Sequence, residues 1–343
     1  MRYEPVTIKD IAKALNFSTS TVSRALRGSY EISDETKKII LDYAEKINYR
    51  PNPIALSLKD RRSKAIGVVV SEISNSFFSE AINGIESIAY NRGYHVIITQ
   101  SHESAEREQV NVLHHASRSV DGMLISLSSG TVDQTYLKDL IDKGMPIVFF
   151  DRISDEIETN KVTANNYLGA FHATEHLITQ GFKRIAHITS APYLSISIER
   201  LHGYRDALEK HNIPFDDSFI RYCKNGGMVM EEIEEALTSL LAGKKRPDAI
   251  FTASDRITTL CFGELKKLKL KKEMGFIGFC NTKVGDLFSP TMSVVKQPAF
   301  EIGQVAIEML IDLIESKRPV TDFTTKIIDT ELIIRESSVQ KVK

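Results

Sequence analysis

Small hydroxyl side chains and an arginine share the outer face of a short helical segment near the N-terminus. Residues 18–26 read Ser-Thr-Ser-Thr-Val-Ser-Arg-Ala-Leu. With Ser18 as the N-cap, a helix over this segment turns its apolar residues inward and leaves outside Thr19, Ser20, Ser23, Arg24 and Arg27. Short hydroxyls let a helix approach base edges, and an arginine fork can bond both major-groove acceptors of guanine, which discriminates bases by about 1–3 kcal/mol. These residue types therefore favour contact with a DNA major groove.

A second helix must position this face, and the preceding residues predict one. Residues 7–15 carry an apolar stripe at helical spacing, formed by Ile8, Ile11, Ala12 and Leu15. Thr7 and Asp10 are placed as an N-cap and its partner in the first turn. A short turn at residues 16–18 then leads into the helix that begins after Ser18. The pair is typical of a helix-turn-helix, although an ordinary helical hairpin with a solvated polar face has the same pattern.

A third amphipathic segment, capped by Ser33, would close a small helical core, since Ile39, Ile40, Tyr43, Ala44 and Ile47 share one face. Two prolines then enforce an extended backbone, and the following residues up to 58 favour a helix of only two turns. A helix this short is marginal alone. We interpret it as a hinge that becomes helical only when stabilised, followed by a basic run at 59–64 that either contacts phosphates or forms a solvated linker.

From about residue 65, short apolar runs alternate with longer amphipathic segments. The runs predict strands at 66–70, 95–99, 122–126, 147–150, 185–189, 249–252 and 276–279, and helical periodicity occurs between them, as at 77–92, 167–179, 198–211 and 256–268. This alternation predicts parallel sheets covered by helices on both faces. The length of the region indicates two such sheets. The fold class is therefore a helical headpiece followed by an α/β core.

Ligands of open α/β sheets collect beyond the carboxyl ends of strands, so the residues that follow the apolar runs are candidates for a binding site. They are Glu72, Phe77, Phe78, Asp151, Arg152, Arg200, Ser254, Asp255, Cys280 and Asn281. Aromatic rings can stack on a sugar or a base, and the carboxylates and arginines can bond its polar groups. Other interpretations stay open: core packing for the two phenylalanines, and capping or ion pairs for Asp151, Arg200 and Asp255.

Composition limits the class of protein. The chain has 343 residues, of which 42% are hydrophobic, enough for substantial cores. Residues 1–64 hold 13 Lys and Arg against 8 Asp and Glu, a net charge of +5, and the remainder hold 31 against 37, a net charge of −6. The basic end is thus the expected nucleic-acid end.

The chain begins with a polar amphipathic segment, so we expect no export signal. No run approaches the roughly 18 apolar residues of a membrane span, so we expect no membrane partner. The three cysteines, Cys223, Cys261 and Cys280, are odd in number and scattered, which argues against a disulfide framework. A cytoplasmic location is the expectation.

One motif offers an enzymatic alternative. Residues 172–176 read His-Ala-Thr-Glu-His, which satisfies the H-x-x-E-H pattern of zinc peptidases. No downstream acidic ligand is evident, and the sequence has no dinucleotide-binding, phosphate-loop or nucleophile-elbow motif. We therefore expect no enzyme, no metal and no cofactor.

The chain resembles the lactose/galactose-repressor (LacI/GalR) family of bacterial transcription regulators over its whole length. The motifs that carry the resemblance lie at 7–12, 21–26, 48–52, 66–70, 73–78, 121–122, 173–177, 200–204 and 331–337. By this resemblance, Thr19, Ser20 and Arg24 read bases, Thr7 and Ser23 hold phosphates, and Ala55 and Leu58 enter the minor groove, with Leu58 as the wedge that bends the operator. Ser18 and Asn52 complete the expected DNA-binding set.

The resemblance also implies a domain organisation. It predicts a DNA-binding domain at 1–50, a hinge and linker at 51–64, and an effector-binding and dimerisation core at 65–343. The core would have the type I periplasmic-binding-protein fold, with one subdomain near 65–160 and 294–322 and the other near 164–289 and 326–340. Three crossovers, near 160–164, 289–294 and 322–326, would join them.

The function implied is a repressor that binds a pseudo-palindromic operator as a homodimer under the control of a small molecule, most simply a sugar or sugar derivative. Sugar-binding members of the family usually carry aspartate where this chain has Cys280, and often asparagine where it has Ser254, which leaves Asn281 as a substitute ligand. A protein co-repressor, a non-sugar metabolite or a solute-binding receptor are the alternatives. The tail at 336–343 lacks a leucine heptad, so a dimer is expected.

Overall fold

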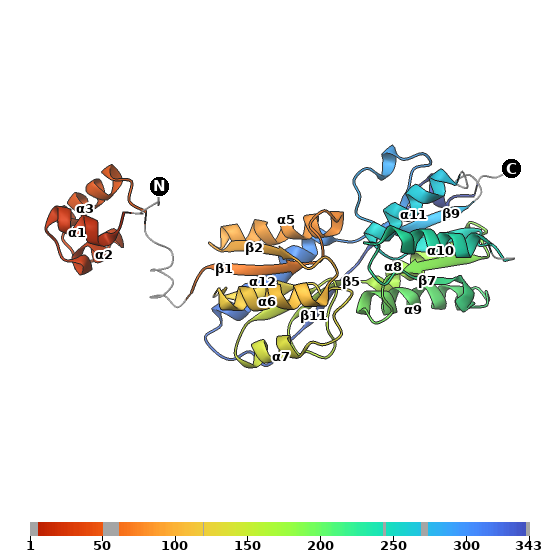
Figure 1. Ribbon diagram of the computed structural model, residues 1–343, viewed down its shortest axis with the longest axis horizontal. Coiled ribbons are helices and arrows are strands. Elements are labelled where there is room, and N and C mark those ends of the chain that lie inside the picture. The colour runs from red at the N-terminus through yellow and green to blue at the C-terminus, as the bar shows by residue number, and fades with distance from the viewer. Residues whose placement is uncertain (1–5, 51–61, 119, 243–244, 269–273, 341–343) are drawn as a thin grey trace. The chain divides into compact units, whose positions relative to one another are not determined.

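The helical N-terminal part and the α/β remainder of the chain form separate units, Met1–Lys64 and Ala65–Lys343 (Figure 1). The computed structural model describes residues 6–50, 62–118, 120–242, 245–268 and 274–340. The predicted hinge helix and wedge, which include Asn52, Ala55 and Leu58, lie outside the described residues. Among the helices of the described residues, none is both long and apolar enough to cross a membrane.

The first unit contains α1 (Ile8–Leu15), α2 (Thr19–Leu26) and α3 (Asp34–Lys46). The predicted caps are confirmed for the last two helices, because the hydroxyl of Ser18 accepts from the amide of Thr21 and that of Ser33 accepts from the amide of Thr36. The three helices close one small core, formed by Ile11, Ala12, Val22, Ala25, Ile40 and Ala44. Its burial fixes α2 against α1 and leaves the polar face of α2 outside.

The described part of the second unit has two six-stranded sheets. The first has the order β11 (Thr325–Ile328), β5 (Lys161–Ala164), β4 (Ile147–Phe150), β3 (Gly122–Ile125), β1 (Ala65–Val70) and β2 (His95–Gln100). The second has the order β12 (Glu331–Ile333), β10 (Ser293–Lys296), β9 (Gly275–Phe279), β8 (Ala249–Thr252), β6 (Ile185–Thr189) and β7 (Ile220–Tyr222). Neighbouring strands are parallel except β10 and β12, which are antiparallel, so the expectation of purely parallel sheets is wrong at this edge.

Helices cover both faces of each sheet, as the alternation predicts (Figure 1). On the first sheet, α5 (Ser76–Asn91) and α12 (Ala299–Glu315) pack on the face that carries Ile66, Val68 and Val148. The opposite face, with Val69 and Phe149, is covered by α6 (Ala105–Ser117) and α7 (Thr135–Asp142). The second sheet lies between the pair α8 (Asn166–Thr179) and α9 (Ser195–Lys210) and the pair α10 (Met230–Ala242) and α11 (Asp255–Lys267). Short 3₁₀ helices occur at Asp217–Phe219, Gly285–Leu287 and Glu336–Ser338.

The three crossovers lie a few residues later than expected. Strand β5 pairs with β4 and β11 pairs with β5, so both belong to the first sheet, whereas β10 pairs with β9 in the second. The chain therefore passes between the subdomains after residues 164, 296 and 328, not near 160–164, 289–294 and 322–326. Strands β5, β10 and β11 have four residues each, and polar residues interrupt their apolar runs, so the sequence does not mark them as strands.

Glycines let two helices of the first subdomain cross at close range. A Cβ atom at Gly303 of α12 would lie 2.0 Å from the carbonyl oxygen of Ala81, and one at Gly84 of α5 would lie 2.0 Å from that of Phe300. By contrast, Gly263 of α11 has no atom within 4 Å of the position of its Cβ.

We expect Gly303→Ala to destabilise the protein by about 1–3 kcal/mol, because the backbone of α5 cannot move away without disturbing the core. Gly263→Ala is the matched control and should stabilise by about 0.5–1 kcal/mol through helix propensity alone. Urea unfolding of both variants measures the difference. Equal effects at the two positions would contradict the close crossing.

His187 of β6 is buried in the second subdomain beside two aromatic rings. Its ring centroid lies 5.1 Å from that of Tyr204 and 4.7 Å from that of Phe251, in stacked geometry. Burial disfavours the charged imidazole and lowers the pKa of His187 to about 3.

Because the unfolded chain binds a proton on this side chain more readily, neutral His187 stabilises the fold fully above about pH 6.5. This contribution is lost as the pH falls from about 6.5 toward 3. His187→Phe should remove the dependence, so its free energy of unfolding relative to the parent should rise by up to about 1.4 kcal/mol per pH unit below 6.5. Denaturant unfolding between pH 5 and pH 8 tests this, and a constant difference would show that His187 does not carry the effect.

Candidate functional site

Helix α2 is the second helix of the helix-turn-helix. Its polar face points away from the small core of the first unit. Thr19, Ser20 and Arg24 are exposed, whereas Ser23 is half-buried. The hydroxyls of Ser18 and Ser20 lie 2.8 Å apart at the start of the helix. Three exposed donors or acceptors thus stand along one short helix, in the arrangement that a major-groove reader requires.

Two of these side chains already have partners within the unit. The Arg24 guanidinium lies 3.3 Å from the Glu31 carboxylate, and both side chains are about half exposed, at 54% and 47%. Such an exposed ion pair contributes little and is easily exchanged for another anion. The Ser23 hydroxyl accepts a hydrogen bond of 2.6 Å from Arg27, which places a second guanidinium beside Arg24.

Thr7 stands at the start of α1 as predicted. Its backbone amide and its hydroxyl both donate to the Asp10 carboxylate, at 2.8 and 2.7 Å. These two hydrogen bonds lower the pKa of Asp10 below its ordinary value. The hydroxyl is exposed and could turn to a phosphate only by leaving Asp10.

A cleft lies between the two subdomains, and the contacts across it include two of the predicted ligand residues, Glu72 and Asn281. Glu72, after β1, forms an ion pair with Arg256 of α11. The amide of Asn281, after β9, donates to Glu80 of α5 at 3.0 Å. Tyr193 donates to the backbone carbonyl of Ser129 on the opposite side. The carboxyl ends of the two sheets therefore face each other, as the topology requires.

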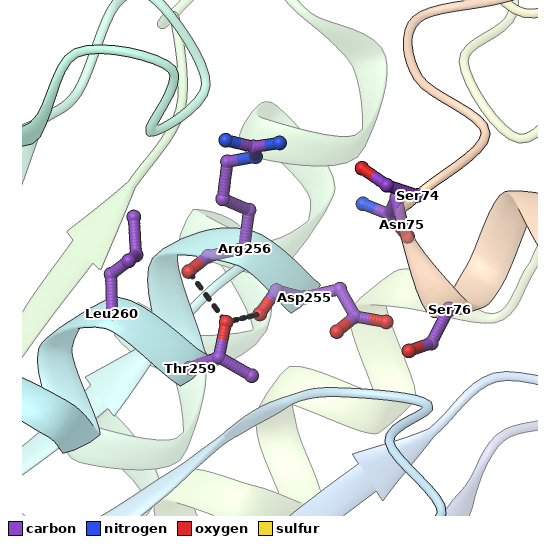
Figure 2. A pocket seen from close by; sticks show the side chains of 7 residues that line it. All are labelled: Ser74, Asn75, Ser76, Asp255, Arg256, Thr259 and Leu260. Atoms are coloured by element: carbon purple, nitrogen blue, oxygen red, sulfur yellow. Dashed lines mark hydrogen bonds between the residues drawn. The ribbon is translucent and has the colours of Figure 1, made fainter.

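Part of this cleft is open as a cavity of about 260 Å³ between the start of α5 and the start of α11. Figure 2 shows the side chains that line it: Ser74, Asn75, Ser76, Asp255, Arg256, Thr259 and Leu260. Hydroxyls, an amide and a guanidinium form most of its wall.

Asp151 and Arg152 follow β4 and are both buried. Asp151 has a left-handed backbone with φ of 60°, and its carboxyl group lies 3.5 Å from the Ser126 hydroxyl and from the Gln297 side-chain amide, and 4.0 Å from Nε of Arg152. Burial raises the pKa of Asp151. Arg152 instead makes two bonds to Glu103, at 2.6 and 2.9 Å, and donates to the carbonyl of Leu127. Asp151 is thus available to a ligand, whereas the Arg152 side chain is largely used within the protein.

Arg200 of α9 is 1% exposed and lies at the carboxyl edge of the second sheet. Its guanidinium donates twice to the side-chain oxygen of Asn166, at 2.9 and 2.7 Å, and once to the carbonyl of Ala253. It also lies 3.8 Å from the ring centroid of Phe279. Burial lowers the pKa of Arg200 to about 10, so it remains charged at neutral pH.

The residues after β8 and β9 are joined by one carboxylate. Asp255 accepts from the amide of Asn281 at 3.0 Å and from the thiol of Cys280 at 3.1 Å, and the amide of Phe77 also favours its charged form. Ser254 caps α11 by accepting from the amide of Ile257. Burial is the largest influence on Asp255 and raises its pKa.

Two predicted contacts belong to the core instead of the open cleft. Phe77 and Phe78 are 3% and 2% exposed and are members of the apolar cluster under α5. The Phe78 ring packs edge-on against Phe150. The core interpretation of Phe78 that the sequence left open is therefore supported.

Sequence reasoning missed Glu103, Asn166 and Gln297. Glu103 is 49 residues from its partner Arg152 and Asn166 is 34 residues from Arg200, so no local pattern links them. Gln297 follows β10, a strand whose sequence Ser-Val-Val-Lys has no apolar run long enough to predict it. A search for polar residues after every strand, including short ones, would have found Gln297.

The H-x-x-E-H motif lies on α8, where two of its three side chains have partners elsewhere in the protein. His172 is exposed, His176 is bonded to Ser338, and Glu175 binds Lys210 and His211. Among the residues that the structure describes, no group of three His, Cys, Asp or Glu side chains could hold a metal ion. Cys223, Cys261 and Cys280 are free and buried.

Known protein families match each of the two units. Residues 7–52 match the bacterial regulatory proteins of the lacI family, and residues 174–338 match a periplasmic binding protein-like domain. The ribose operon repressor of Haemophilus influenzae is 31% identical over 337 residues, which cover 96% of this chain and 98% of that protein. The transcriptional repressor PurR of Photobacterium profundum is also 31% identical, over 96% of this chain and 98% of its own.

Solved structures agree. A protein described as a ribose operon repressor from Burkholderia thailandensis aligns with a TM-score of 0.71 at 32% identity, covering 79% of this chain and 99% of that one. The sequence matches extend over both units and nearly the full length of the relatives. The chain therefore belongs to the LacI family of bacterial regulatory proteins.

Proposed function

We propose that this regulator represses transcription by binding a pseudo-palindromic operator as a homodimer, and that a small molecule in the cleft controls the binding. Members of the family are DNA-binding transcription regulators and not enzymes. The observation that carries the proposal is the exposed polar face of α2, supported by caps on α2 and α3. A repressor of this kind acts on the chromosome, so we place it in the cytoplasm.

We assign base reading to Thr19, Ser20 and Arg24, whose side chains are exposed. Thr7 and Ser18 lie at the starts of α1 and α2, and Ser23 contacts Arg27. We assign these three residues to contacts with DNA phosphates, which fix the position of the helix on the DNA backbone. Asn52, Ala55 and Leu58 remain proposed hinge contacts on the grounds of the sequence alone. The Arg24–Glu31 ion pair would be exchanged for contacts to guanine.

The dimer is proposed to form through the edge of the first sheet. Strand β2 is an edge strand, and its Ile97 is 44% exposed. On the neighbouring helix α6, Val110 and Leu113 are 61% and 44% exposed and lie three residues apart, hence on one face. Exposed apolar side chains gathered at an unpaired edge favour burial against a second copy.

The effector is proposed to bind between the subdomains, against Asp151, Arg200 and Asp255. A sugar or sugar derivative fits the combination of a carboxyl group, a guanidinium and hydroxyls, and the relative from Haemophilus influenzae is named as a repressor of a ribose operon. Glu72, Ser254, Cys280 and Asn281, which follow strands β1, β8 and β9, remain proposed contacts of the same effector. An effector changes DNA affinity only by its different affinity for two arrangements of the subdomains.

Selection of bound sequences from random duplexes, at a fixed salt concentration, tests the regulator itself. A pseudo-palindrome is expected. With that site in hand, Arg24→Ala should reduce discrimination at one base position in each half-site by about 1–3 kcal/mol, roughly 5- to 150-fold.

Arg27→Ala is the matched control, since it removes the same charge from the same helix. It should weaken binding to all sequences alike and lower the salt dependence. Binding titrations on single-base variants of the operator measure both effects. A uniform loss with Arg24→Ala would refute its role in base reading.

The dimer surface has its own test. Val110→Glu should place a charge in the proposed interface and shift the protein to monomers, with weaker operator binding because the two half-sites are no longer held together. Val132→Glu, which changes another exposed valine outside this surface, is the control. Sedimentation at several protein concentrations measures the equilibrium, and an unchanged dimer in Val110→Glu would exclude this face.

A further inference from the structure

A tight turn of the second subdomain lies against the carboxylate of Glu103 in the first subdomain. The turn follows β7 and contains Asn225, Gly226 and Gly227, and both glycines are buried although they lie in a loop. A Cβ atom at Gly226 would lie 3.1 Å from Oε1 of Glu103, so any side chain at this position would press on the carboxylate. The turn therefore makes a direct contact between the subdomains.

The turn has a fixed shape within the second subdomain. Gly226 and Gly227 both have left-handed backbones, with φ of 60° and 83°. The Gly226 amide donates to the carbonyl of Cys223 at 2.9 Å. The backbone and side-chain amides of Asn225 donate to the Glu232 carboxylate of α10, at 3.1 and 3.0 Å. These bonds tie the turn to α10, so the turn moves with the second subdomain.

Glu103 is held just as firmly in the first subdomain. Its carboxylate accepts two hydrogen bonds from Arg152, at 2.6 and 2.9 Å, and one from the backbone amide of Ser129, at 2.7 Å. The two side chains of the ion pair are each 7% exposed. Because either charge would be costly to bury alone, each member of the pair fixes the position of the other.

The backbone is strained where this ion pair meets the turn. His102 and Glu103 are consecutive residues with left-handed backbones, at φ of 49° and 62°, and Asp151, which precedes Arg152, has φ of 60°. Residues other than glycine rarely adopt this conformation, and those that do so cluster at functional sites and switch regions. The strain places both members of one ion pair beside the other subdomain, which indicates that the contact serves a function.

Two further contacts between the subdomains are connected to this one. Tyr193 of the second subdomain donates to the carbonyl of Ser129, whose own amide is bonded to the buried carboxylate. A Cβ atom at Gly227 would lie 3.3 Å from Cγ of Arg256, which forms the ion pair with Glu72 across the cleft. One carboxylate and one turn therefore link three contacts between the subdomains.

We propose that Glu103 and the turn at 225–227 form a clasp that holds the two subdomains in the arrangement described, and that Glu103 is thereby a positioning residue for the control of DNA binding. The inference rests on the proposed function, in which the arrangement of the subdomains controls the affinity for the operator. The clasp consists of the protein's own groups, so it sets the balance between two arrangements before an effector binds. An effector shifts the balance from the value that the clasp sets.

The test enlarges the residue at the contact. Gly226→Asn should preserve the turn, because asparagine adopts a left-handed backbone more readily than most residues, but its side chain should displace Glu103 and open the clasp. Spin labels on Val132→Cys and Glu235→Cys, two exposed positions in different subdomains, report the distance between the subdomains. The three native cysteines are buried, and excess unlabelled protein separates the labelled chains. We expect a longer distance in Gly226→Asn than in the parent.

Gly93→Asn is the matched control. Gly93 also has a left-handed backbone, with φ of 72°, but no atom lies within 4 Å of the position of its Cβ. The control therefore carries the same change of residue without a contact between the subdomains, and it should leave the distance unchanged. An unchanged distance in folded Gly226→Asn, or an equal change in Gly93→Asn, would overturn the clasp.

Tyr193→Phe tests the same clasp without added bulk. It removes the hydrogen bond to the Ser129 carbonyl, so it should also lengthen the distance between the labels. In the double variant with Gly226→Asn, the two effects should be less than additive, because both changes act on one connected set of contacts. Fully additive effects would show that the contacts are independent and would contradict a single clasp.

Binding to the selected operator is the second readout. Gly226→Asn should change the operator affinity by about fivefold or more relative to Gly93→Asn. A longer distance with unchanged affinity would overturn the role of Glu103 in the control of DNA binding. The distance measurement needs no DNA, so failure of the operator selection would count against the regulator, whereas the label distance decides the clasp.

Discussion

The buried charges at the carboxyl ends of the strands are the constraint on which the core depends. The Glu103 side chain is only 7% exposed, yet Arg152 and the amide of Ser129 keep its pKa below the ordinary value. Glu108 is fully buried and accepts from Ser128, Thr131 and Tyr136, while burial raises its pKa. Because removing one partner of a buried ion pair costs about 3–5 kcal/mol, these contacts fix the loop over residues 126–131 at the cleft.

Polar groups also join the two walls of the cleft, and this allows the cleft to respond to a ligand. Its walls are joined by polar contacts between side chains, including Glu72 with Arg256 and Glu80 with Asn281, and the polar groups of a ligand can replace such contacts. The subdomains themselves are held by continuous apolar cores. A ligand can therefore exchange the contacts across the cleft without disturbing either core, and the change in DNA affinity is limited to the free energy that distinguishes the two arrangements.

The sequence predicts the elements that have strong local signals. The caps at Ser18 and Ser33 and the buried strands β1, β4 and β8 follow from residue type and apolar runs. The sequence does not predict the short strands β5, β7, β10, β11 and β12, because each is stabilised by pairing with strands far along the chain. For the same reason Arg152 was predicted as a ligand residue: its partner Glu103 becomes adjacent only in the folded sheet.

The contacts of Asn281 in the structure differ from the role that its place in the sequence suggests. Its position after β9 suggested that it replaces the carboxylate missing at Cys280. In the structure its amide nitrogen donates to Glu80 and to the carbonyl of Gln297, and its side-chain oxygen accepts from the amide of Gln297. These bonds use most of its capacity and tie β9 to the crossover after β10 and to α5. Asn281 therefore links the two subdomains, and its side chain has little hydrogen-bonding capacity left for a ligand.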